Sequence, residues 1–486
     1  MSGPFIFSRR RFLQQAGGTS ALMLAASIDK FGLSSAAASV SDYKALVCVF
    51  MFGGNDSNNM VMPSTNYAQY LAGRPSSGGI TIPNVGGVQD PISKMNAMLP
   101  ISPANTPGAM YGLHPGMPEL QNLFSVGKCA ILCNVGSLSE PITRTQYISS
   151  NHGGKKVPDN LFSHSDQQQQ FMTAVDNASL AKITGWGGRL LDAMLNQLPV
   201  ANTPISMSFS GSQTFGNGVS VRSLSLPTGG NFGFSGDSQT PSPTQIARSA
   251  ARSTLLTLPD SNQIVQAAQS TMGVALTSSQ LLNPILQGTG STAITSAFAG
   301  VNSGLANQLK AVAKVIEQRA ALGHSPGREV FFVSIGGFDT HTGEINGHNN
   351  LYPQVSKAMN AFYLATANMG VANNVTQFTL SDFGRTMKPN SAGTDHGWGS
   401  HHFIVGGDGV SPGSVNGNNL YGFFPNLMMG TAGTDDSGSQ GRWIPTTAMD
   451  QYGATLAKWF GASPSDVTQI FPNIPKFATA DLGFYR

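Results

Sequence analysis

Continuous apolar runs alternate with amphipathic stretches along most of the chain. The apolar runs cover residues 45–52, 130–135, 330–335 and 376–380. They lack polar alternation, so they predict strands that are buried on both faces. The amphipathic stretches cover residues 115–126, 305–322 and 355–369, and their spacing predicts helices. This alternation predicts an α/β protein, a layered sheet with helices on both faces.

Residues 201–300 differ in composition from the rest of the chain. Their only charged residues are Arg222, Asp237, Arg248, Arg252 and Asp260, and Ser, Thr, Gly and Gln dominate. We interpret this segment as an insertion or cap with short β elements, followed by helices near 243–256 and 260–285. It covers a site, meets a partner, or is a surface elaboration, and the sequence leaves these alternatives open.

The N-terminus has the pattern of a twin-arginine export signal. The string SRRRFLQ (8–14) precedes a modest apolar stretch, Ala16–Ile28, and then SSAAAS (34–39). These 13 residues are too few to cross about 30 Å of hydrocarbon. We therefore predict a signal peptide over residues 1–38, one domain over 39–486, export by the twin-arginine translocase, and a periplasmic or secreted protein. No later apolar run is long enough to predict a membrane span after cleavage.

Composition excludes several classes of function. The net charge of +3 includes the signal-peptide arginines, and no basic stripe with interleaved aromatics predicts nucleic-acid binding. There is no CxxC, haem motif or convincing GxGxxG, so a redox role has no support. Cys48 falls in a predicted strand, and Cys129 and Cys133 are too far apart along a strand for an easy bridge. We expect no disulfide to support the fold.

Five of the nine histidines fall between positions 341 and 402, and the motifs of this region, from residue 336 on, also carry three aspartates. The strings are GGFDTH (336–341), SDFGR (381–385) and TDHGWGSHH (394–402). Imidazoles and carboxylates gathered in this way favour a divalent metal site. The alternative is that these histidines lie in glycine-rich surface loops and bond to backbone or water.

Polar residues follow four predicted strands directly, where ligands collect in open α/β sheets. They are Asp56 and Ser57, then Ser137, Ser139, Thr143 and Arg144, then Asp339 and His341, and finally Asp382 and Arg385. Of the hydroxyls, Thr143 is the first candidate nucleophile, ahead of Ser139 and Ser57, with turn or cap chemistry as the alternative for each. Arg144 or Arg385 would hold an anionic group, although Arg385 also suits a structural role. His164, in LFSHSDQQ, is either a ligand or a packed side chain.

The order of these strands and loops resembles the alkaline phosphatase/sulfatase superfamily. The set GGND, LFSHSDQQ, GGFDTH, DFGRT and TDHGWGS is more closely similar to an uncharacterised exported bacterial family, with a domain of unknown function, assigned to that superfamily. The resemblance implies an alkaline-phosphatase-like fold and one or two metals held by Asp and His. A formylglycine enzyme is excluded at SEPITR, which has no Cys.

The same resemblance implies a set of metal ligands. These are Asp56, Asp339, His341, Asp382, Asp395 and His396, with His401 or His402 as alternatives for the last histidine. The chain departs from the superfamily pattern at two places. His341 follows Asp339 by two residues instead of about four, and Phe383 stands where a histidine normally follows Asp382. A site with one metal, or with none, fits these departures as well as one with two.

Two functions follow from this sequence. The first is an exported hydrolase of phosphate or sulfate esters that depends on zinc, manganese, calcium or magnesium and takes a small anionic ester as substrate. The alternative is a catalytically degenerate binding or assembly protein of the cell envelope, which works with a protein partner.

Overall fold

The computed structural model describes residues 40–176, 184–233 and 241–486. The predicted signal peptide lies outside the described residues. A nine-stranded mixed sheet forms the centre, with strand order β11-β5-β10-β9-β1-β8-β6-β7, and β12 also pairs with β5. Its strands are β1 (Tyr43–Met51), β5 (Cys129–Gly136), β6 (Ser206–Ser208), β7 (Leu224–Ser225), β8 (Gly327–Ile335), β9 (Val375–Ser381), β10 (Ser400–Gly406), β11 (Leu420–Tyr421) and β12 (Thr447–Ala448). Only β10 runs antiparallel to its neighbours, so β1, β8 and β9 end at the same edge of the sheet.

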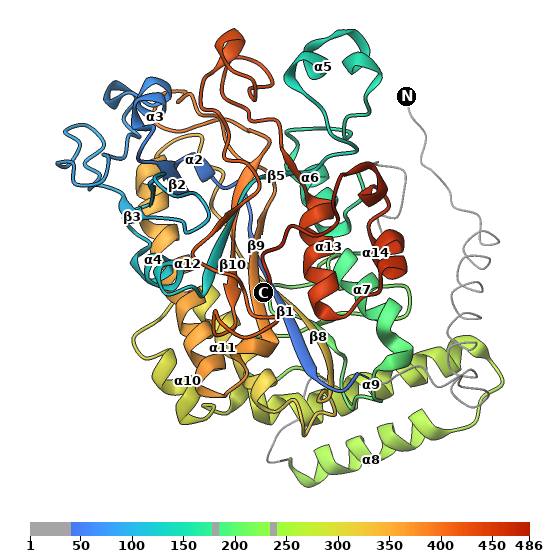
Figure 1. Cartoon of the computed structure of the whole chain (residues 1–486). Helices are drawn as coiled ribbons and strands as arrows, with labels where there is room; N and C mark the ends of the chain where they lie inside the picture. The colour runs from blue at the N-terminus through green and yellow to red at the C-terminus, as the bar shows by residue number, and fades with distance from the viewer. Residues whose placement is uncertain (1–39, 177–183, 234–240) are drawn as a thin grey trace, which may run out of the picture.

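Helices cover both faces of this sheet (Figure 1). On one face lie α4 (Pro118–Ser125), α10 (Thr292–Ala297), α11 (Gly304–Glu317) and α12 (Glu344–Asn368), and on the other lie α6 (His164–Thr173), α7 (Trp186–Met194), α13 (Met449–Phe460) and α14 (Pro464–Ile470). The predicted α/β class, a layered sheet with helices on both faces, is confirmed.

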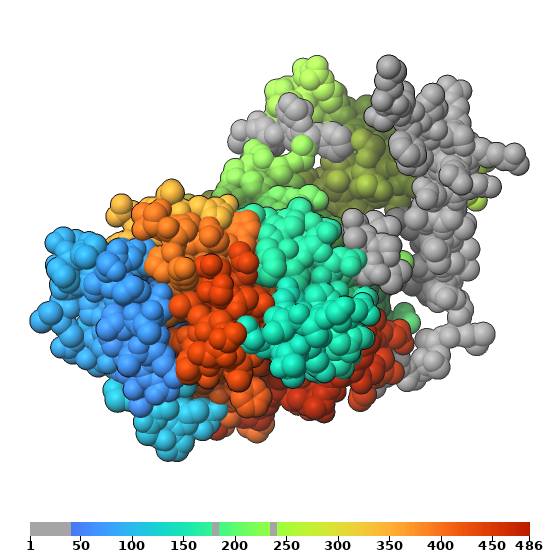
Figure 2. Space-filling view, turned by 90° about the horizontal axis from the view of Figure 1, so that it is seen from above, coloured from blue at the N-terminus to red at the C-terminus, as the bar shows by residue number. Residues whose placement is uncertain are grey.

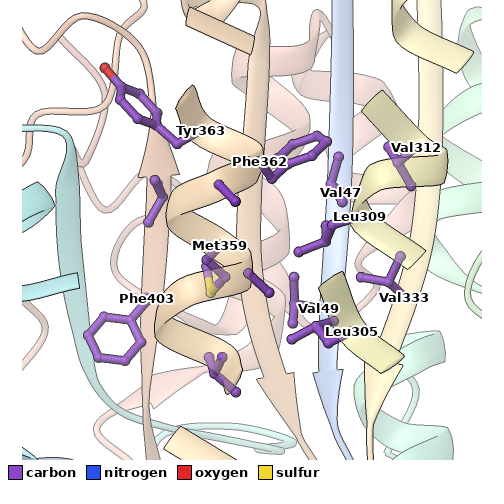
Figure 3. Packing of buried hydrophobic residues seen from close by; sticks show 14 of the residues in the cluster. Val47, Val49, Leu305, Leu309, Val312, Val333, Met359, Phe362, Tyr363 and Phe403 are labelled. Carbon is purple, nitrogen blue, oxygen red and sulfur yellow. The ribbon is translucent and has the colours of Figure 1, made fainter. Parts of the chain in front are cut away.

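The central strand β1 shows why the predicted strands are continuously apolar. Val47 and Val49 belong to the core cluster that includes Leu305 and Leu309 of α11 (Figure 3). The alternate residues Cys48 and Phe50 belong to the core cluster on the opposite face. Successive side chains of a strand point to opposite faces, so a strand between two helical layers has no polar position. All three cysteines are buried free thiols.

The predicted helix at 355–369 begins earlier than expected. In the structure α12 runs through Pro353 and begins at Glu344, close to the GGFDTH motif. The prediction for 305–322 errs at the other end, because α11 ends at Glu317.

The segment 201–300 contributes strands β6 and β7 to one edge of the main sheet, where Met207 pairs with Phe331 of β8. It also contains the helices α8 (Pro243–Thr257) and α9 (Gln263–Gln287), which extend at the bottom of the molecule as drawn (Figure 1). None of the residues of α8 is buried.

Short elements complete the fold. Strands β2 (Val61–Pro63), β4 (Tyr111–Leu113) and β3 (Leu99–Ile101) form a second sheet, and α2 (Ser57–Met60), α3 (Tyr67–Gly73) and α5 (Arg144–Ile148) are short helices. From above, the early segments (blue), the segment around α5 and α6 (teal) and the late loops (orange-red) lie side by side on one face (Figure 2). In the described ranges, no helix has both the length and the apolarity needed to cross a bilayer.

Candidate metal centre

The loops that follow β1, β8 and β9 are tied together at Gly53. Its N–H donates to both carboxylate oxygens of Asp382 at 3.2 Å, and its carbonyl accepts Nη1 of Arg385 at 3.0 Å. A Cβ at this position would lie 2.4 Å from the backbone nitrogen of Asp339, and the φ of +114° also disfavours any other residue. Glycine therefore lets the β1 and β8 loops touch, which brings Asp339 and Asp382 to one place.

The Asp339 carboxylate is the meeting point of three histidines, and we call these four residues the histidine cluster. Oδ1 of Asp339 lies 3.1 Å from Nε2 of His341 and 3.5 Å from Nε2 of His396. Its Oδ2 lies 3.4 Å from Nε2 of His164, which begins α6. The Asp339 side chain is 45% exposed, so the cluster opens to solvent.

In each histidine, Nε2 faces Asp339, and Nδ1 is hydrogen-bonded to an oxygen of another residue. The partners are Asp382 Oδ2 for His164 (2.7 Å), Asp395 Oδ1 for His341 (3.2 Å) and the Phe162 carbonyl for His396 (2.7 Å). These oxygens accept hydrogen bonds, so each neutral ring carries its proton on Nδ1 and leaves a lone pair on Nε2. The three lone pairs face Asp339, which is the arrangement that metal-binding histidines adopt.

Local charges shift the pKa values of these groups. Burial, together with the positive charges of His164 and Arg385, lowers the pKa of His396, which keeps this ring neutral. Burial alone would raise the pKa of Asp339, but the hydrogen bond and charge of Arg385 outweigh it and lower that pKa. The hydrogen bond to Asp382 raises the pKa of His164. Nε2 of His164 is buried and has no hydrogen-bond partner, so it is the atom through which this ring would hold a cation.

Several residues expected at a metal site lie at or beside the histidine cluster. The cluster contains Asp339, His341 and His396, while Asp382 and Asp395 hold Nδ1 atoms at its back. Arg385 is fully buried and donates to Asp339 at 3.0 Å, so it orients this carboxylate.

His401 and His402 lie elsewhere, inside strand β10, and neither bonds to the histidine cluster. Nδ1 of His401 accepts the Asn134 N–H at 3.0 Å, and Nδ1 of His402 lies 3.5 Å from the Thr379 hydroxyl. Burial lowers the pKa of both rings to about 3, so they are neutral core residues.

Asp56 also lies apart from the histidine cluster. Both of its oxygens accept hydrogen bonds from Arg74, at 2.5 and 2.8 Å, and neither side chain is exposed. Glu344 and His348, on the first turns of α12, complete what we call the buried ionic cluster with Asp56 and Arg74. Asp56, Glu344 and His348 place ligand-type atoms within 4.8 Å of one another, so they form a second group with the composition of a metal site.

The hydroxyls predicted as nucleophiles form no hydrogen bond to the histidine cluster. Thr143 is the N-cap of α5 and forms a capping box with Gln146. The hydroxyls of Ser139 and Ser57 are buried without a partner. Arg144 donates to the Gly438 carbonyl at 3.4 Å.

The sequence left open whether His164 is a ligand or a packed side chain. It did not identify Gln168, Phe162 or Arg442 as residues of the site. Gln168 donates to Asp382 at 2.8 Å, and the Arg442 Nε donates to the His396 carbonyl at 2.8 Å while its guanidinium lies 5.0 Å from the Phe162 ring. The sequence signals for His164 were the motif LFSHSDQQ and its position directly after Ser163, the N-cap residue of α6. Its partner Asp382 lies 218 positions away.

Comparison with known proteins gives a family match and distant structural similarity. The chain is similar to the solved structure of Ps i-CgsB in complex with k-i-k-neocarrahexaose, with 9% identity, a TM-score of 0.34, and coverage of 88% of this chain and 74% of that one. It is also similar to PsFucS1 sulfatase from Pseudoalteromonas sp., with 10% identity, a TM-score of 0.33, and coverage of 93% and 72%. None of the curated proteins matches the chain. A family model described as "Protein of unknown function (DUF1501)" matches residues 43–420, and the chain therefore belongs to that family.

Proposed function

We propose that this chain is an exported, metal-dependent hydrolase of phosphate or sulfate esters, with its metal held by the histidine cluster. One observation carries this proposal: three Nε2 lone pairs face one carboxylate because every Nδ1 is bonded to an oxygen. Without a cation, the Nε2 atoms of His341 and His396 face each other at 3.0 Å. The motifs that resemble the alkaline phosphatase/sulfatase superfamily supply the ester class.

The donor set narrows the choice of metal. Three imidazole nitrogens and one carboxylate suit zinc or another transition metal, whereas magnesium and calcium prefer oxygen ligands throughout. His164, His396 and Asp339 form the tightest set, with ligand atoms within 4.8 Å, and His341 adds a fourth donor. Zinc is therefore the first candidate, ahead of manganese.

A divalent cation in such a site supplies positive charge that acidifies water and stabilises an ester oxyanion. The surrounding residues orient the donors. Asp382 holds the His164 ring, and Arg385 holds the Asp339 carboxylate. The nucleophile in this proposal is water, because Thr143, Ser139 and Ser57 form no hydrogen bond to the cluster.

Arg442 is the arginine that we propose for binding the anionic group of the ester. Arg385 is occupied by backbone carbonyls, Thr394 and Asp339. Arg442 uses its Nε on the His396 carbonyl, and among the described residues its two Nη atoms form no hydrogen bond. A guanidinium held beside the cluster in this way can present two donors to a phosphate or sulfate.

The test is metal content and ester hydrolysis of the mature protein, purified without chelator. We expect about one equivalent of a transition metal and cleavage of p-nitrophenyl phosphate or p-nitrophenyl sulfate, both lost in His396→Ala. The matched control is His152→Ala, because Nδ1 of His152 also bonds a carbonyl, that of Tyr147, but lies outside the cluster. A metal-free wild-type protein, or full activity in His396→Ala, would contradict the proposal.

A second candidate is a binding or assembly role in the cell envelope. The helices α8 and α9 favour it, because they expose large apolar side chains, which monomeric proteins seldom gather on one element. These are Ile246, Leu255, Ile264, Val265, Met272, Val274 and Leu281, and Leu258 directly after α8 is exposed as well. A stable partner recovered with the wild-type protein, and lost after Leu255→Ser and Ile264→Ser, would support this role. A monomeric, active enzyme would count against it.

A further inference from the structure

The buried ionic cluster is connected to the histidine cluster by a continuous chain of hydrogen bonds. Oε2 of Glu344 accepts the hydroxyl of Thr394 at 2.5 Å, and the hydroxyl of Thr340 lies 3.3 Å away. The Thr394 oxygen accepts Nε of Arg385 at 2.9 Å. Arg385 then donates to Oδ1 of Asp339 at 3.0 Å. Three bonds therefore separate Glu344 from the carboxylate at the centre of the histidine cluster.

The direction of these bonds is fixed by chemistry. A guanidinium nitrogen only donates, so the Thr394 oxygen accepts from Arg385 and its hydrogen points to Glu344. Thr394 and Glu344 have no exposed surface and Arg385 is 1% exposed, so water does not compete for the two bonds that join these three residues. A change at Glu344 therefore reaches Asp339 through Thr394 and Arg385.

The charges around Glu344 favour its neutral form. Arg74 is the nearest cation, but both of its terminal nitrogens bond Asp56, and Nη1 lies 3.9 Å from Oε1 of Glu344. An ionised Glu344 would place a second buried negative charge beside Asp56 with no cation of its own, which is costly. Protonation of Glu344 removes this second negative charge and leaves Arg74 paired with Asp56 alone. Burial first, and then the charge of Asp56, raise the pKa of Glu344 to about 8.

We propose that Glu344 is a neutral, proton-carrying positioning residue that holds Asp339 in place through Thr394 and Arg385. This inference rests on the proposed function, because it gives Asp339 the role of a metal ligand. The competing arrangement is a second metal held by an ionised Glu344 with Asp56 and His348. That arrangement would explain why Oε1 of Glu344 and both ring nitrogens of His348 are buried without a hydrogen-bond partner.

Substitution by glutamine separates the two arrangements. Glutamine has the shape and donor of a protonated glutamate but cannot ionise, so Glu344→Gln should keep the zinc affinity of the wild-type protein. Loss of an outer partner costs about 10–100-fold in metal affinity, and we expect this loss in Glu344→Ala and Thr394→Val. Affinity is measured by competition for Zn²⁺ with a chromophoric chelator, and metal content is measured alongside.

Each result decides the proposal. Equal weakening in Glu344→Gln and Glu344→Ala, or a second equivalent of zinc that Glu344→Gln loses, would overturn the neutral assignment. Unchanged affinity in Glu344→Ala and Thr394→Val would overturn the positioning role.

Two measurements on metal-free protein separate this inference from the proposed function. The infrared difference spectrum of wild type minus Glu344→Gln should show the C=O stretch of a protonated carboxyl group at neutral pH. A crystal structure of Glu344→Ala should show that Arg385 no longer bonds Asp339. If the wild-type protein binds no zinc, the proposed function fails, but a missing infrared band or a retained Arg385–Asp339 bond would still reject the role of Glu344.

Discussion

Nε2 of His341 and Nε2 of His396 lie 3.0 Å apart, and both face Oδ1 of Asp339. The bonds of their Nδ1 atoms to Asp395 and to the Phe162 carbonyl keep the ring protons on the far sides. Two lone pairs this close repel each other unless a proton or a metal lies between them. This pair therefore favours the binding of a cation.

Removal of metal should lower the thermal stability of the wild-type protein. A cation that binds only the folded chain stabilises it by about 2.7 kcal/mol at a concentration one hundred times Kd. We expect differential scanning calorimetry to show a lower Tm after chelation and recovery after zinc is added. His396→Ala should melt at the same temperature with and without zinc. A wild-type Tm that does not change when zinc is removed or added would contradict the metal site.

Asp382→Asn should weaken metal binding without removing any donor of the histidine cluster. The Asp382 carboxylate accepts a hydrogen bond from Nδ1 of His164 at 2.7 Å. This bond fixes the orientation of the His164 ring and increases the basicity of its Nε2 atom. We expect a loss of about 10–100-fold in zinc affinity, measured by chelator competition. Asp260→Asn, at the exposed turn between α8 and α9, is the matched control and should leave the affinity unchanged. Equal affinities in all three proteins would show that this outer carboxylate does not tune the site.

The fold could be predicted because its signal is local. Residues 45–52 are apolar at every position, and β1 is covered by two helical layers. The start of α12 was predicted too late, at residue 355 instead of Glu344, because its first turns carry few apolar residues at helical spacing.

The site was predictable only in part. Asp339, His341, Asp382 and His396 stand in motifs at strand ends, where the sheet gathers them. The role of His164 depends on a contact across 218 positions, which no local pattern encodes. Conversely, His401 and His402 stand in the same histidine-rich string as His396 but enter strand β10. The direction of the His401 and His402 side chains is set by the alternation of side chains along β10, and not by their closeness in sequence to His396.

The core between β1 and α11 should be sensitive to a cavity, whereas the α8–α9 pair should not. Leu309 is fully buried against Val47 and Val49, so Leu309→Ala removes apolar contacts and leaves a cavity (Figure 3). We expect it to lower the free energy of unfolding by about 2–5 kcal/mol. Leu255→Ala is the matched control, because this leucine is 62% exposed, and it should change stability by no more than about 0.5 kcal/mol. Urea denaturation measures both values, and a comparable loss in Leu255→Ala would mean that α8 is packed against a partner in solution.

The buried carboxyl of Glu344 should make the stability of the protein depend on pH. Its pKa is about 8 in the folded chain and near 4.5 in the unfolded chain, so the folded state binds the proton more tightly. The stabilisation from this proton is complete below the unfolded value and is lost as the pH rises through the folded value. We expect the free energy of unfolding of the metal-free wild-type protein to fall between about pH 5 and pH 8. Glu344→Gln cannot ionise, so its stability should fall less over the same range. Urea denaturation at several pH values compares the two proteins, and parallel curves would show that Glu344 is already ionised at pH 5, with Arg74 or a bound cation compensating its charge.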